Sequence, residues 1–547
     1  MKRYVIGIDY GTLSARAVLV EISSGKEIAE EVYVYPHAVM DTALPSGKPL
    51  PPLFALQHPS DYTEALSAIV QGVLAQAAVL PEEIAALGID FTSCTVLPMT
   101  EDGTPLCLLP AFADEPHAYV KLWKHHGAIP YAEELYRVAE ERDEPWLSLY
   151  GGGLSSEMLF PKILETLRNA PSVYSSAAYF MEAGDWLTYL LTGQRVCGAS
   201  FAGLKAFWSE ELRYPSKDFF AAVDPMWKDI VGTKISPDVR TAKEPLAGVL
   251  NARGAAMTGL LPGTPLALPI VDSHAAIPAL NVAREGELLL VVGTSSCHII
   301  NADREVAIPG ICGYVNNGMM PDCITYEAGQ AGAGDSFDWF VKNCVPAAYT
   351  AEAESRQVSV HKILREKAEH LAVGENHLIA LDWFNGNRSL LKNDALSGMI
   401  VGMTLTTKSE EIYRALLEST AYGLRRIIEQ YEAYGIEIRS ICAAGGISQK
   451  DPLLMQIYAD VTGREIRVTS ATQAGARGSA VYASVAAGVF SDLYEAAQHF
   501  ALPDKTSYLP NAGNKAVYDR LYAEYCRLSD YFGKGENPVM ERLTAGI

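Results

Sequence analysis

The residues of this 547-residue chain best suited to chemistry stand in a polar break, Asp9-Tyr10-Gly11-Thr12-Leu13-Ser14, between two apolar runs. The runs, residues 5–8 and 17–20, are β-rich and bounded by turn residues, so we expect two strands joined by a tight loop. Hydroxyl side chains and free backbone N–H groups suit a polyphosphate, and the acid at the strand end suits its metal ion. A Gly-Thr turn in a hairpin is more often only a turn, so the motif alone leaves both interpretations open.

The same pattern returns about half a chain later. Residues 288–300 read LLLVVGTSSCHII, in which Gly293-Thr294-Ser295-Ser296 separates two strand-like runs. Repetition of G-T-x-S in one strand–turn–strand context predicts two related halves, whose loops approach one ligand from opposite sides of a cleft. We place the boundary in the polar stretch 281–286 and expect α/β halves at 1–284 and 285–547.

An acid follows a buried-looking strand in LALPIVDSHAAIPAL, residues 266–280. Asp272 could simply cap the small-residue helix expected after it. An acid at the carboxyl end of a strand also lies at the mouth of an α/β sheet, where ligands bind. Phosphoryl transfer to an alcohol needs a carboxylate there that takes the hydroxyl proton, and Asp272 is the best candidate for that base.

Four further stretches carry candidate binding residues. In ICAAGGIS, Gly445 and Gly446 either form an ordinary strand-to-helix turn or let a flat purine lie against the backbone. Lys205 in GLKAFW and Glu327 in YEAGQ stand among apolar or small residues, so each is either paired or lines a polyhydroxylated substrate. Trp123 is either core or a flat wall for a sugar.

The hydrophobic pattern also predicts the elements that must position these residues. We expect strands at 85–91, 95–99 and 439–444 and a long amphipathic helix at 411–431. The Pro-rich residues 46–59 predict a surface loop, and the tail beyond Tyr531 is expected to be polar and mobile.

The composition predicts a soluble protein of two or more domains, with 49% hydrophobic and 20% charged residues. The net charge of -21 argues against nucleic acid or an anionic membrane surface as the main partner. The nine cysteines contain no C-x-x-C pair, which indicates reduced thiols in a cytoplasmic protein. His125 and His126 are interpreted as a solvated helix face rather than as metal ligands. Asp9 interrupts the first apolar run, so we expect neither a signal peptide nor a membrane span.

The stretches IGIDYGTLSAR, VVGTSSC, AAGGIS and GMIVGMTLTTKSEEIYRALLES together resemble the FGGY carbohydrate kinases, over nearly the whole chain. Four others, KLWKHH, YGGGLSSE, AGLKAFW and LDWFNGNR, resemble the branch of that family that phosphorylates L-ribulose in arabinose breakdown. The resemblance implies two actin-like ATPase domains of the ribonuclease H type, with the active site in the cleft between them. It also implies a cytoplasmic enzyme that uses ATP and Mg²⁺.

Carried over position by position, the resemblance implies a role for each candidate. Asp272 is the catalytic base beside the sugar, and Asp9 holds Mg²⁺ through water. The sugar contacts are Lys205, Glu327 and the backbone of Thr95, Val96 and Leu97, with Trp123 as a neighbour. The ATP contacts are Gly11, Thr12, Ser14, Arg16, Gly293, Thr294, Ser295, Gly445 and Gly446. The first half would thus hold the sugar, the first phosphate loop and the base, and the second half the second phosphate loop, adenosine and the tail.

One departure and three alternatives remain. Ser93-Cys94 stand where the branch usually has glycine and serine, which affects the local backbone and with it the substrate preference. The chain could instead phosphorylate xylulose, ribitol or glycerol, and Lys205 argues for L-ribulose. An actin- or chaperone-like ATPase would share both phosphate hairpins. A sugar-binding regulator without catalysis is disfavoured by Asp9 and Asp272. A homodimer is compatible with the resemblance, whereas nucleic-acid and membrane partners are not expected.

Overall fold

The computed structural model describes residues 2–282 and 285–544, which form two compact α/β units. Unit 1 comprises the described residues up to 282 together with Tyr314–Thr325 and Gln473–Ala501, and unit 2 comprises the others. The predicted boundary at residue 284 lies outside the described residues. Because two later segments belong to unit 1, a single division into 1–284 and 285–547 does not describe how the chain packs.

The main sheet of unit 1 has seven strands. Its order is β11 (Leu246–Val249), β12 (Pro265–Ala267), β5 (Ile84–Phe91), β1 (Tyr4–Tyr10), β2 (Ser14–Glu21) and β3 (Glu27–Val34), and β13 (Ile270–Val271) also pairs with β5. β1 and β2 form the antiparallel hairpin predicted around residues 9–14, and β5 is the strand predicted at 85–91. β5 runs parallel to β1.

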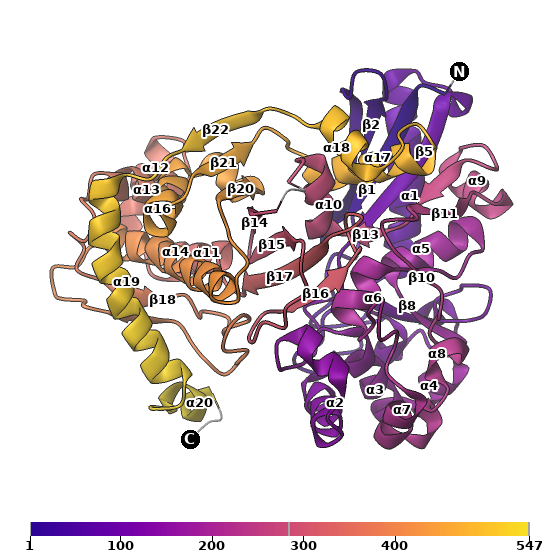
Figure 1. Cartoon of the computed structure of the whole chain (residues 1–547), viewed down its shortest axis with the longest axis horizontal. Coiled ribbons are helices and arrows are strands. Elements are labelled where there is room, and N and C mark those ends of the chain that lie inside the picture. Colours follow the sequence, from indigo (N-terminus) through magenta and orange to yellow (C-terminus); the bar gives the residue numbers. More distant parts are fainter. Residues whose placement is uncertain (1, 283–284, 545–547) are drawn as a thin grey trace. The chain divides into compact units, whose positions relative to one another are not determined.

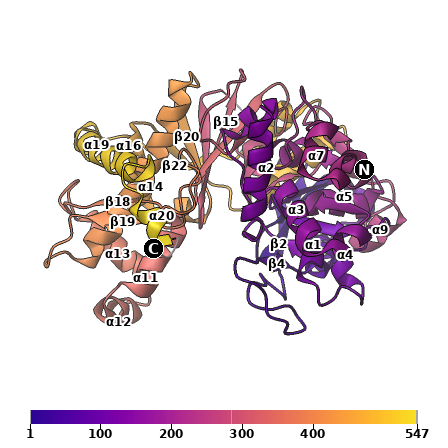
Figure 2. The same ribbon diagram turned by 90° about the horizontal axis from the view of Figure 1, so that it is seen from below.

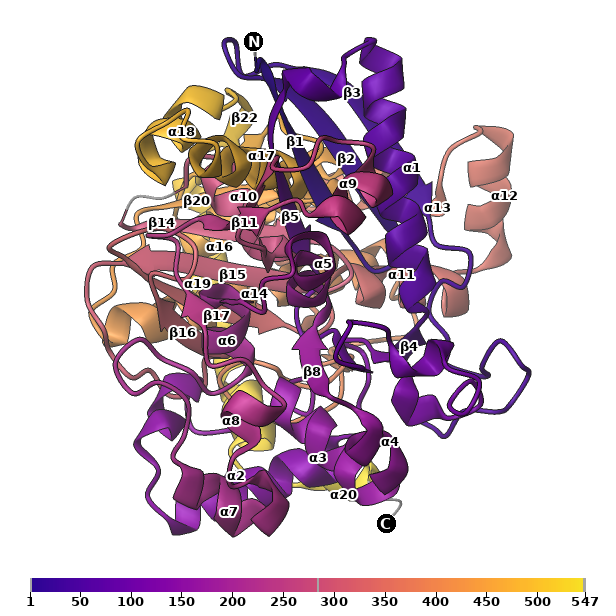
Figure 3. The same ribbon diagram turned by 90° about the vertical axis from the view of Figure 1, so that its right-hand side faces the viewer.

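Helices cover both faces of this sheet, which explains why β1 and β5 are apolar along most of their length. Ile6 and Ile8 of β1 belong to a core that includes residues of α1 (Pro59–Ala77), the helix that runs along β2 and β3 (Figure 3). Gly7, on the alternate face, meets α17 (Ala474–Ala486). Figure 1 shows this late helix, with α18 (Leu493–Phe500), beside the indigo strand β1.

Two glycines let the backbone of α17 approach the sheet closely. A Cβ added to Gly7 would overlap the carbonyl oxygen of Ala476, and one added to Gly88 of β5 would overlap that of Ser479. Only a residue without a side chain fits at either position. This contact places residues 473–501 in unit 1, although they follow most of unit 2 in the chain.

A second sheet of unit 1 has the order β4 (Leu56–Gln57), β7 (Val120–Lys121), β6 (Val96–Met99) and β8 (Tyr179–Glu182). β6 confirms the strand predicted at 95–99. The surface loop predicted at 46–59 is wrong at its end, because residues 54–57 are buried and β4 pairs with β7. The apolar Phe54-Ala55-Leu56 run outweighs the nearby prolines.

The remaining elements of unit 1 are short. The strands are β9 (Cys197–Gly198) and β10 (Val239–Arg240). The helices are α2 (Ile129–Glu141), α3 (Leu159–Asn169), α4 (Pro171–Ser176), α5 (Ala183–Thr192), α6 (Ala199–Lys205), α7 (Lys217–Val223), α8 (Ile230–Thr233), α9 (Ala252–Thr258) and α10 (Asp272–Ala279).

The sheet that holds the second hairpin repeats the plan of the first. Its order is β16 (Gly313–Asn316), β17 (Ile324–Gln330), β15 (Ser296–Ala302), β14 (Glu287–Val292), β20 (Ser440–Ala444), β21 (Ile466–Thr469) and β22 (Asp504–Tyr508). β14 is antiparallel to β15 and parallel to β20, as β1 is to β2 and β5. The topology therefore confirms the repeat that G-T-x-S predicted.

Helices pack beside this sheet in unit 2. α14 (Ser409–Ala433) confirms the long helix predicted at 411–431, and β20 confirms the strand at 439–444. α14 lies with α16 (Pro452–Thr462) and α19 (Ala512–Gly533) (Figure 2). The other elements are β18 (Ile379–Leu381), β19 (Met399–Val401), α11 (Gly334–Asn343), α12 (Ala347–Ser355), α13 (Val360–Glu369), α15 (Gly446–Lys450) and α20 (Val539–Thr544).

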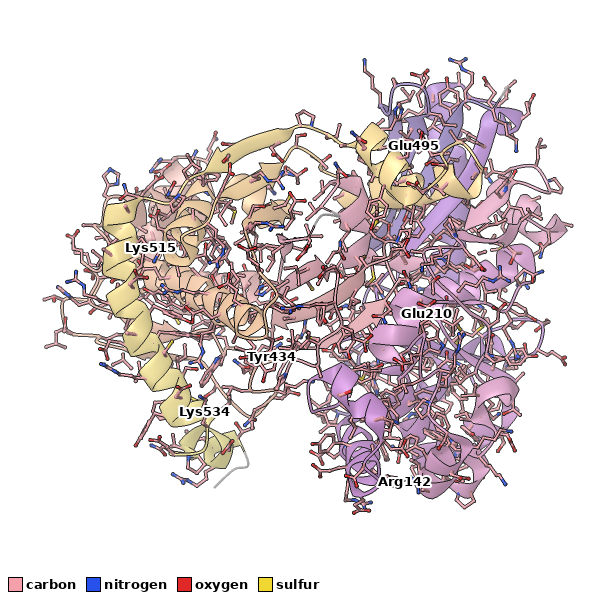
Figure 4. The ribbon with its side chains drawn as sticks, in the orientation of Figure 1. Arg142, Glu210, Tyr434, Glu495, Lys515 and Lys534 are labelled. Carbon is pink, nitrogen blue, oxygen red and sulfur yellow. The ribbon has the colours of Figure 1, made fainter. Side chains whose placement is uncertain are left out.

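The tail is more ordered than its composition predicts. Lys515 and Lys534, labelled in Figure 4 towards the two ends of α19, form ion pairs one turn away, with Asp519 at 2.9 Å and Asp530 at 3.1 Å. Beyond them, Met540 of α20 is buried and Asn393 donates to Glu541 at 2.7 Å. The expectation of a mobile tail is therefore wrong for α20. Within the described parts of the chain, none of the helices has the length and apolar character needed to cross a membrane.

The close approach of α17 to β5 predicts that Gly88→Ala destabilises unit 1. The new methyl group meets backbone, which cannot rotate away, so we expect a loss of about 3 kcal/mol in the free energy of unfolding. Chemical denaturation of the variant measures this loss. Gly446→Ala serves as the control, because nothing lies within 4 Å of a Cβ there. Equal stability of the two variants would contradict the proposed packing.

Candidate active site

Three carboxylates converge in unit 1 at the carboxyl ends of neighbouring strands. The register of β1 and β5 sets Asp9 opposite Asp90. β13 continues the parallel pattern, with Ile270 opposite Asp90, and Asp272 follows directly at the start of α10. The prediction of a strand followed by a helix around Asp272 is confirmed, although the strand is interrupted between β12 and β13.

The buried carboxylates of this cluster disfavour each other's charged forms. Burial, followed by the charge of Asp9, raises the pKa of Asp90 well above its usual range, and Asp272 adds to this rise. Burial also raises the pKa of Asp9, against the opposing charge of Arg16. The Arg16 Nε lies 3.5 Å from Asp9 Oδ2. Carboxylates gathered in the interior are costly unless a positive charge joins them, so Asp9 and Asp90 could hold a divalent cation.

Asp90 is a site residue that the sequence interpretation missed. It is fully buried, and its Oδ2 accepts a hydrogen bond of 2.7 Å from the Ser479 hydroxyl of α17. Its signal was present, because it is an acid near the end of the predicted strand IAALGIDF. The same signal, an acid at the end of a strand, identified Asp272. For residues 85–91 only a strand was predicted, and no role was assigned to Asp90.

Asp272 is the first residue of α10 and follows strand β13 directly. Its Oδ1 accepts a hydrogen bond of 2.7 Å from the backbone N–H of Ser273 at the start of α10. The residue is only half-buried, unlike Asp90, so its carboxylate can be reached. The N-cap position of α10 is occupied by Val271, so Asp272 is the first residue inside the helix rather than its cap.

The first hairpin loop lies beside these acids. The Gly11 N–H donates to the Ser14 carbonyl at 3.0 Å and closes the turn. Arg16 donates to the Ser14 hydroxyl at 3.4 Å and to the Gln473 side chain at 3.2 Å. The predicted phosphate contacts Gly11, Ser14 and Arg16 thus lie together.

Two more elements approach the same loop. The Trp123 indole N–H donates to the Thr12 hydroxyl at 3.2 Å, so the predicted sugar neighbour meets the predicted phosphate loop within unit 1. The first turn of α17 lies against Asp9, since a Cβ on Gly475 would be 3.0 Å from the carboxylate carbon. The positive end of a helix favours a carboxylate at this position.

The second hairpin loop and the Gly-Gly turn meet in unit 2. The Gly293 N–H donates to the Ser295 carbonyl at 2.9 Å, two residues on, so this loop is closed one residue earlier than the loop that begins at Gly11. The Thr294 side chain is exposed. Gly445 has a φ of +94°, and a Cβ there would overlap the Val292 carbonyl oxygen next to the loop. Gly446 faces open space, which suits a flat ring. The predicted ATP contacts of this half therefore form one cluster.

The predicted sugar contacts lie in both units. Lys205 ends α6 of unit 1, where its charge affects Cys94 and Glu182. Glu327 lies on β17 in unit 2 and, like Lys205, is 8% exposed. Thr95 differs from the prediction, because its N–H donates to Glu182 at 2.8 Å and its carbonyl accepts from Ala183 at 2.8 Å. These backbone groups already have partners inside unit 1, and Val96 and Leu97 are buried in β6.

His125 and His37 each make a hydrogen bond with a carboxylate of this chain. His125 is buried outside any helix, and its Nε2 lies 2.8 Å from Glu165 Oε2, so the predicted solvated helix face is wrong. His37, His58 and Asp61 bring metal-ligating atoms within 4.8 Å of one another. However, His37 Nδ1 already pairs with Asp61 at 2.6 Å, and the two imidazoles stack with an interplanar angle of 18°. The Asp61 carboxylate is thus already engaged by His37, so this cluster is better described as a hydrogen-bonded His–Asp pair.

Comparison with known proteins agrees with this geometry. The N-terminal and C-terminal domain models of the FGGY family of carbohydrate kinases match residues 4–277 and 288–487. The chain therefore belongs to the FGGY family of carbohydrate kinases.

Its curated relatives include the ribulokinase of Bacillus licheniformis, 48% identical with 97% of each chain covered. The ribulokinase of Geobacillus thermodenitrificans is 47% identical, with 99% of this chain and 97% of the relative covered. Among solved structures, a xylulose kinase from Rhodospirillum rubrum matches with a TM-score of 0.78 at 22% identity, over 96% of this chain and 98% of that one. A gluconate kinase from Lactobacillus acidophilus matches with a TM-score of 0.78 at 19% identity, over 97% and 98%. These structures confirm the predicted two-domain kinase fold and show nothing about the substrate.

The buried carboxylate cluster predicts that Asp90→Asn stabilises the ligand-free protein. The amide keeps an acceptor for Ser479 and removes both a buried charge and its repulsion with Asp9, which should add about 1 kcal/mol or more at neutral pH. Thermal unfolding without metal or nucleotide measures the gain. Asp61→Asn is the matched control with the opposite sign, because the buried Asp61 is paired with His37. A melting temperature for Asp90→Asn at or below that of the unchanged protein would contradict the repulsion.

Proposed function

We propose that this chain transfers the γ-phosphoryl group of ATP to the terminal hydroxyl of L-ribulose, giving L-ribulose 5-phosphate and ADP in L-arabinose degradation. The observation that carries the proposal is 48% identity with a ribulokinase over 97% of both chains. In this chain Asp272 also lies close enough to Asp90 for their charges to interact. Membership of a carbohydrate kinase family argues against the actin- or chaperone-like alternative.

Asp272 is the proposed catalytic base. Its half-buried carboxylate would accept the proton of the sugar hydroxyl as the oxygen attacks phosphorus. The backbone N–H of Ser273 holds one of its oxygens and so fixes the direction of the other. Such positioning is most of what a protein can contribute to phosphoryl transfer.

The residues present fit a magnesium-bound triphosphate. Asp9 and Asp90 would hold the metal, since both are buried carboxylates on adjacent strands. The metal neutralises charge on the phosphate oxygens when it is bound. Thr12, Ser14 and Thr294, with the N–H groups of their loops, would orient the phosphates, and Gly446 would leave room for adenine. Loops of both units are thus assigned to one reaction.

Lys205 and Glu327 are the proposed polar contacts of the sugar, and Trp123 is its flat neighbour. Trp123 is well suited, because its indole N–H is fixed on Thr12 and its ring is half-buried. Val96 and Leu97 remain proposed contacts, while Thr95 is better described as a support of the site. The enzyme is proposed to act in the cytoplasm, and a homodimer remains a prediction.

The substrate is tested by ADP release, measured with a coupled assay over a panel of pentuloses and pentitols. We expect L-ribulose to stimulate release more strongly than xylulose, ribitol or glycerol. A stronger response to another member would reassign the substrate within the family. If no member stimulated release, the kinase proposal would be wrong.

The role of Asp272 predicts that Asp272→Asn lowers turnover by about 100-fold or more, the usual size of a general-base effect, while sugar binding persists. Turnover and sugar affinity are measured separately, by the coupled assay and by calorimetry. The control is Asp61→Asn, which removes another acid of unit 1 outside the proposed site. Turnover of Asp272→Asn close to that of the control would remove Asp272 from the role.

A further inference from the structure

The peptide group between Cys94 and Thr95 is held by opposite buried charges at its two ends. Its carbonyl oxygen, that of Cys94, accepts a hydrogen bond from the Lys162 ammonium. Its N–H, that of Thr95, donates to the Glu182 carboxylate at 2.8 Å. Lys162 is 1% exposed and Glu182 4% exposed. Both charges therefore act on one peptide dipole in the interior, where such bonds are strong.

The two hydrogen bonds to the Cys94–Thr95 peptide lie next to a strained backbone conformation. Cys94 has a φ of +57°, in the left-handed region that a residue with a side chain seldom adopts. Ser93, which replaces the expected glycine, is not in that region. The departure from the family pattern is thus accommodated at Ser93, and the strain lies at Cys94, next to the peptide that Lys162 and Glu182 hold. Strained backbone persists where the surrounding structure fixes it, and it is common at functional sites.

Lys162 also contacts the segment that leads to Trp123. The residues proposed to contact the sugar, Lys205, Glu327, Trp123, Val96 and Leu97, are called the sugar side below. The Lys162 ammonium also donates to the carbonyl of Leu122 at 2.8 Å, one residue before Trp123. This single buried cation, on α3, therefore ties the loop before β6 to the turn that carries the indole. Burial lowers the pKa of Lys162, and the neighbouring acids oppose this effect.

Glu182 links the same peptide to Lys205. It occupies the N-cap position of α5, yet its carboxylate does not cap that helix and goes to Thr95 instead. Burial raises the pKa of Glu182 to about 7, while Lys162, the Thr95 N–H and Lys205 all favour its charged form. The carboxylate thus lies within the electrostatic reach of Lys205.

We propose that Lys162 and Glu182 are positioning residues for the sugar contacts of unit 1, which fix the Cys94–Thr95 peptide and, through the Lys162–Leu122 hydrogen bond, the placement of Trp123 relative to that peptide. They set sugar affinity and selectivity and take no part in the chemistry. The inference rests on the proposed function, because that proposal assigns Trp123 and Lys205 to the sugar.

The test compares steady-state kinetics of Glu182→Gln and Lys162→Met with the unchanged enzyme. Glutamine keeps an oxygen for the Thr95 N–H and removes the charge, so it is the gentler change. We expect KM for L-ribulose to rise about 10- to 100-fold, the value of a hydrogen bond to a charged group. KM for ATP should change less, because the first phosphate loop is reached through the Trp123–Thr12 hydrogen bond. Selectivity for L-ribulose over xylulose should fall in both variants.

Glu418→Gln is the matched control. Glu418 is a buried glutamate of unit 2, paired with Arg414 at 2.9 Å and remote in sequence from the sugar-side residues. A merely structural effect of losing a buried acid would appear in this variant too. Equal changes in KM for L-ribulose in Glu418→Gln and Glu182→Gln, or no change in Glu182→Gln, would overturn the proposal.

A rescue experiment separates positioning from general damage. If Lys162 serves to hold Cys94 in its left-handed conformation, glycine at position 94 adopts that conformation without strain. Cys94→Gly should therefore recover part of the sugar affinity lost in Lys162→Met. Failure to recover any affinity in the double variant, when it is folded by circular dichroism, would contradict the strain-holding role.

The failure of this inference is distinguishable from failure of the proposed function. All variants are assayed with the sugar that the unchanged enzyme uses best in the panel. An unchanged enzyme that ignores every sugar refutes the proposed function, whereas an active one whose variants keep their sugar KM refutes only the positioning role.

Discussion

The structure depends on the parallel pairing of β1 with β5, which sets Asp9 beside Asp90 in the interior of unit 1. Two like charges in such a place raise the free energy of the fold unless a cation joins them. β1 and β5 can carry buried acids near their carboxyl ends because the rest of each strand is well packed. Apolar side chains, including those of α1, cover one face of the sheet, and α17 covers the other. The glycines that admit α17 also bring Ser479 to Asp90 and the first turn of that helix to Asp9. A late segment of the chain thus completes a site that the first hairpin begins.

Buried charge is used differently on the sugar side. There Lys162 and Glu182 are each hydrogen-bonded to a backbone group, and together they hold the peptide next to the strained residue Cys94. The contrast is consistent with the two proposed roles, metal binding for Asp9 and Asp90 and positioning for Lys162 and Glu182. Both groups lie in unit 1, whereas unit 2 supplies loops whose backbone groups and glycines suit a nucleotide.

The sequence predicted the features that are local or repeated. The two hairpins, the strand of β5 and the helix α14 follow from apolar patterns, and Asp272 follows from its place after a strand. The membership of α17 in unit 1 could not be predicted, because it rests on Gly7 meeting Ala476 and Gly88 meeting Ser479. Contacts between residues so far apart in the chain have no local signal in the sequence. The roles of Lys162 and Glu182 could not be predicted for the same reason. The prediction of a solvated helix face for His125 was wrong because its partner, Glu165, is distant in sequence.

The central claim is that the acids of unit 1 direct the γ-phosphoryl group of ATP to one hydroxyl of L-ribulose. It is tested most directly by identifying the product with ³¹P NMR after incubation of the enzyme with ATP, Mg²⁺ and L-ribulose. The account predicts one phosphomonoester on the terminal carbon-5 oxygen for each ADP formed. Inorganic phosphate as the only new phosphorus species, or a phosphate on another carbon, would contradict it.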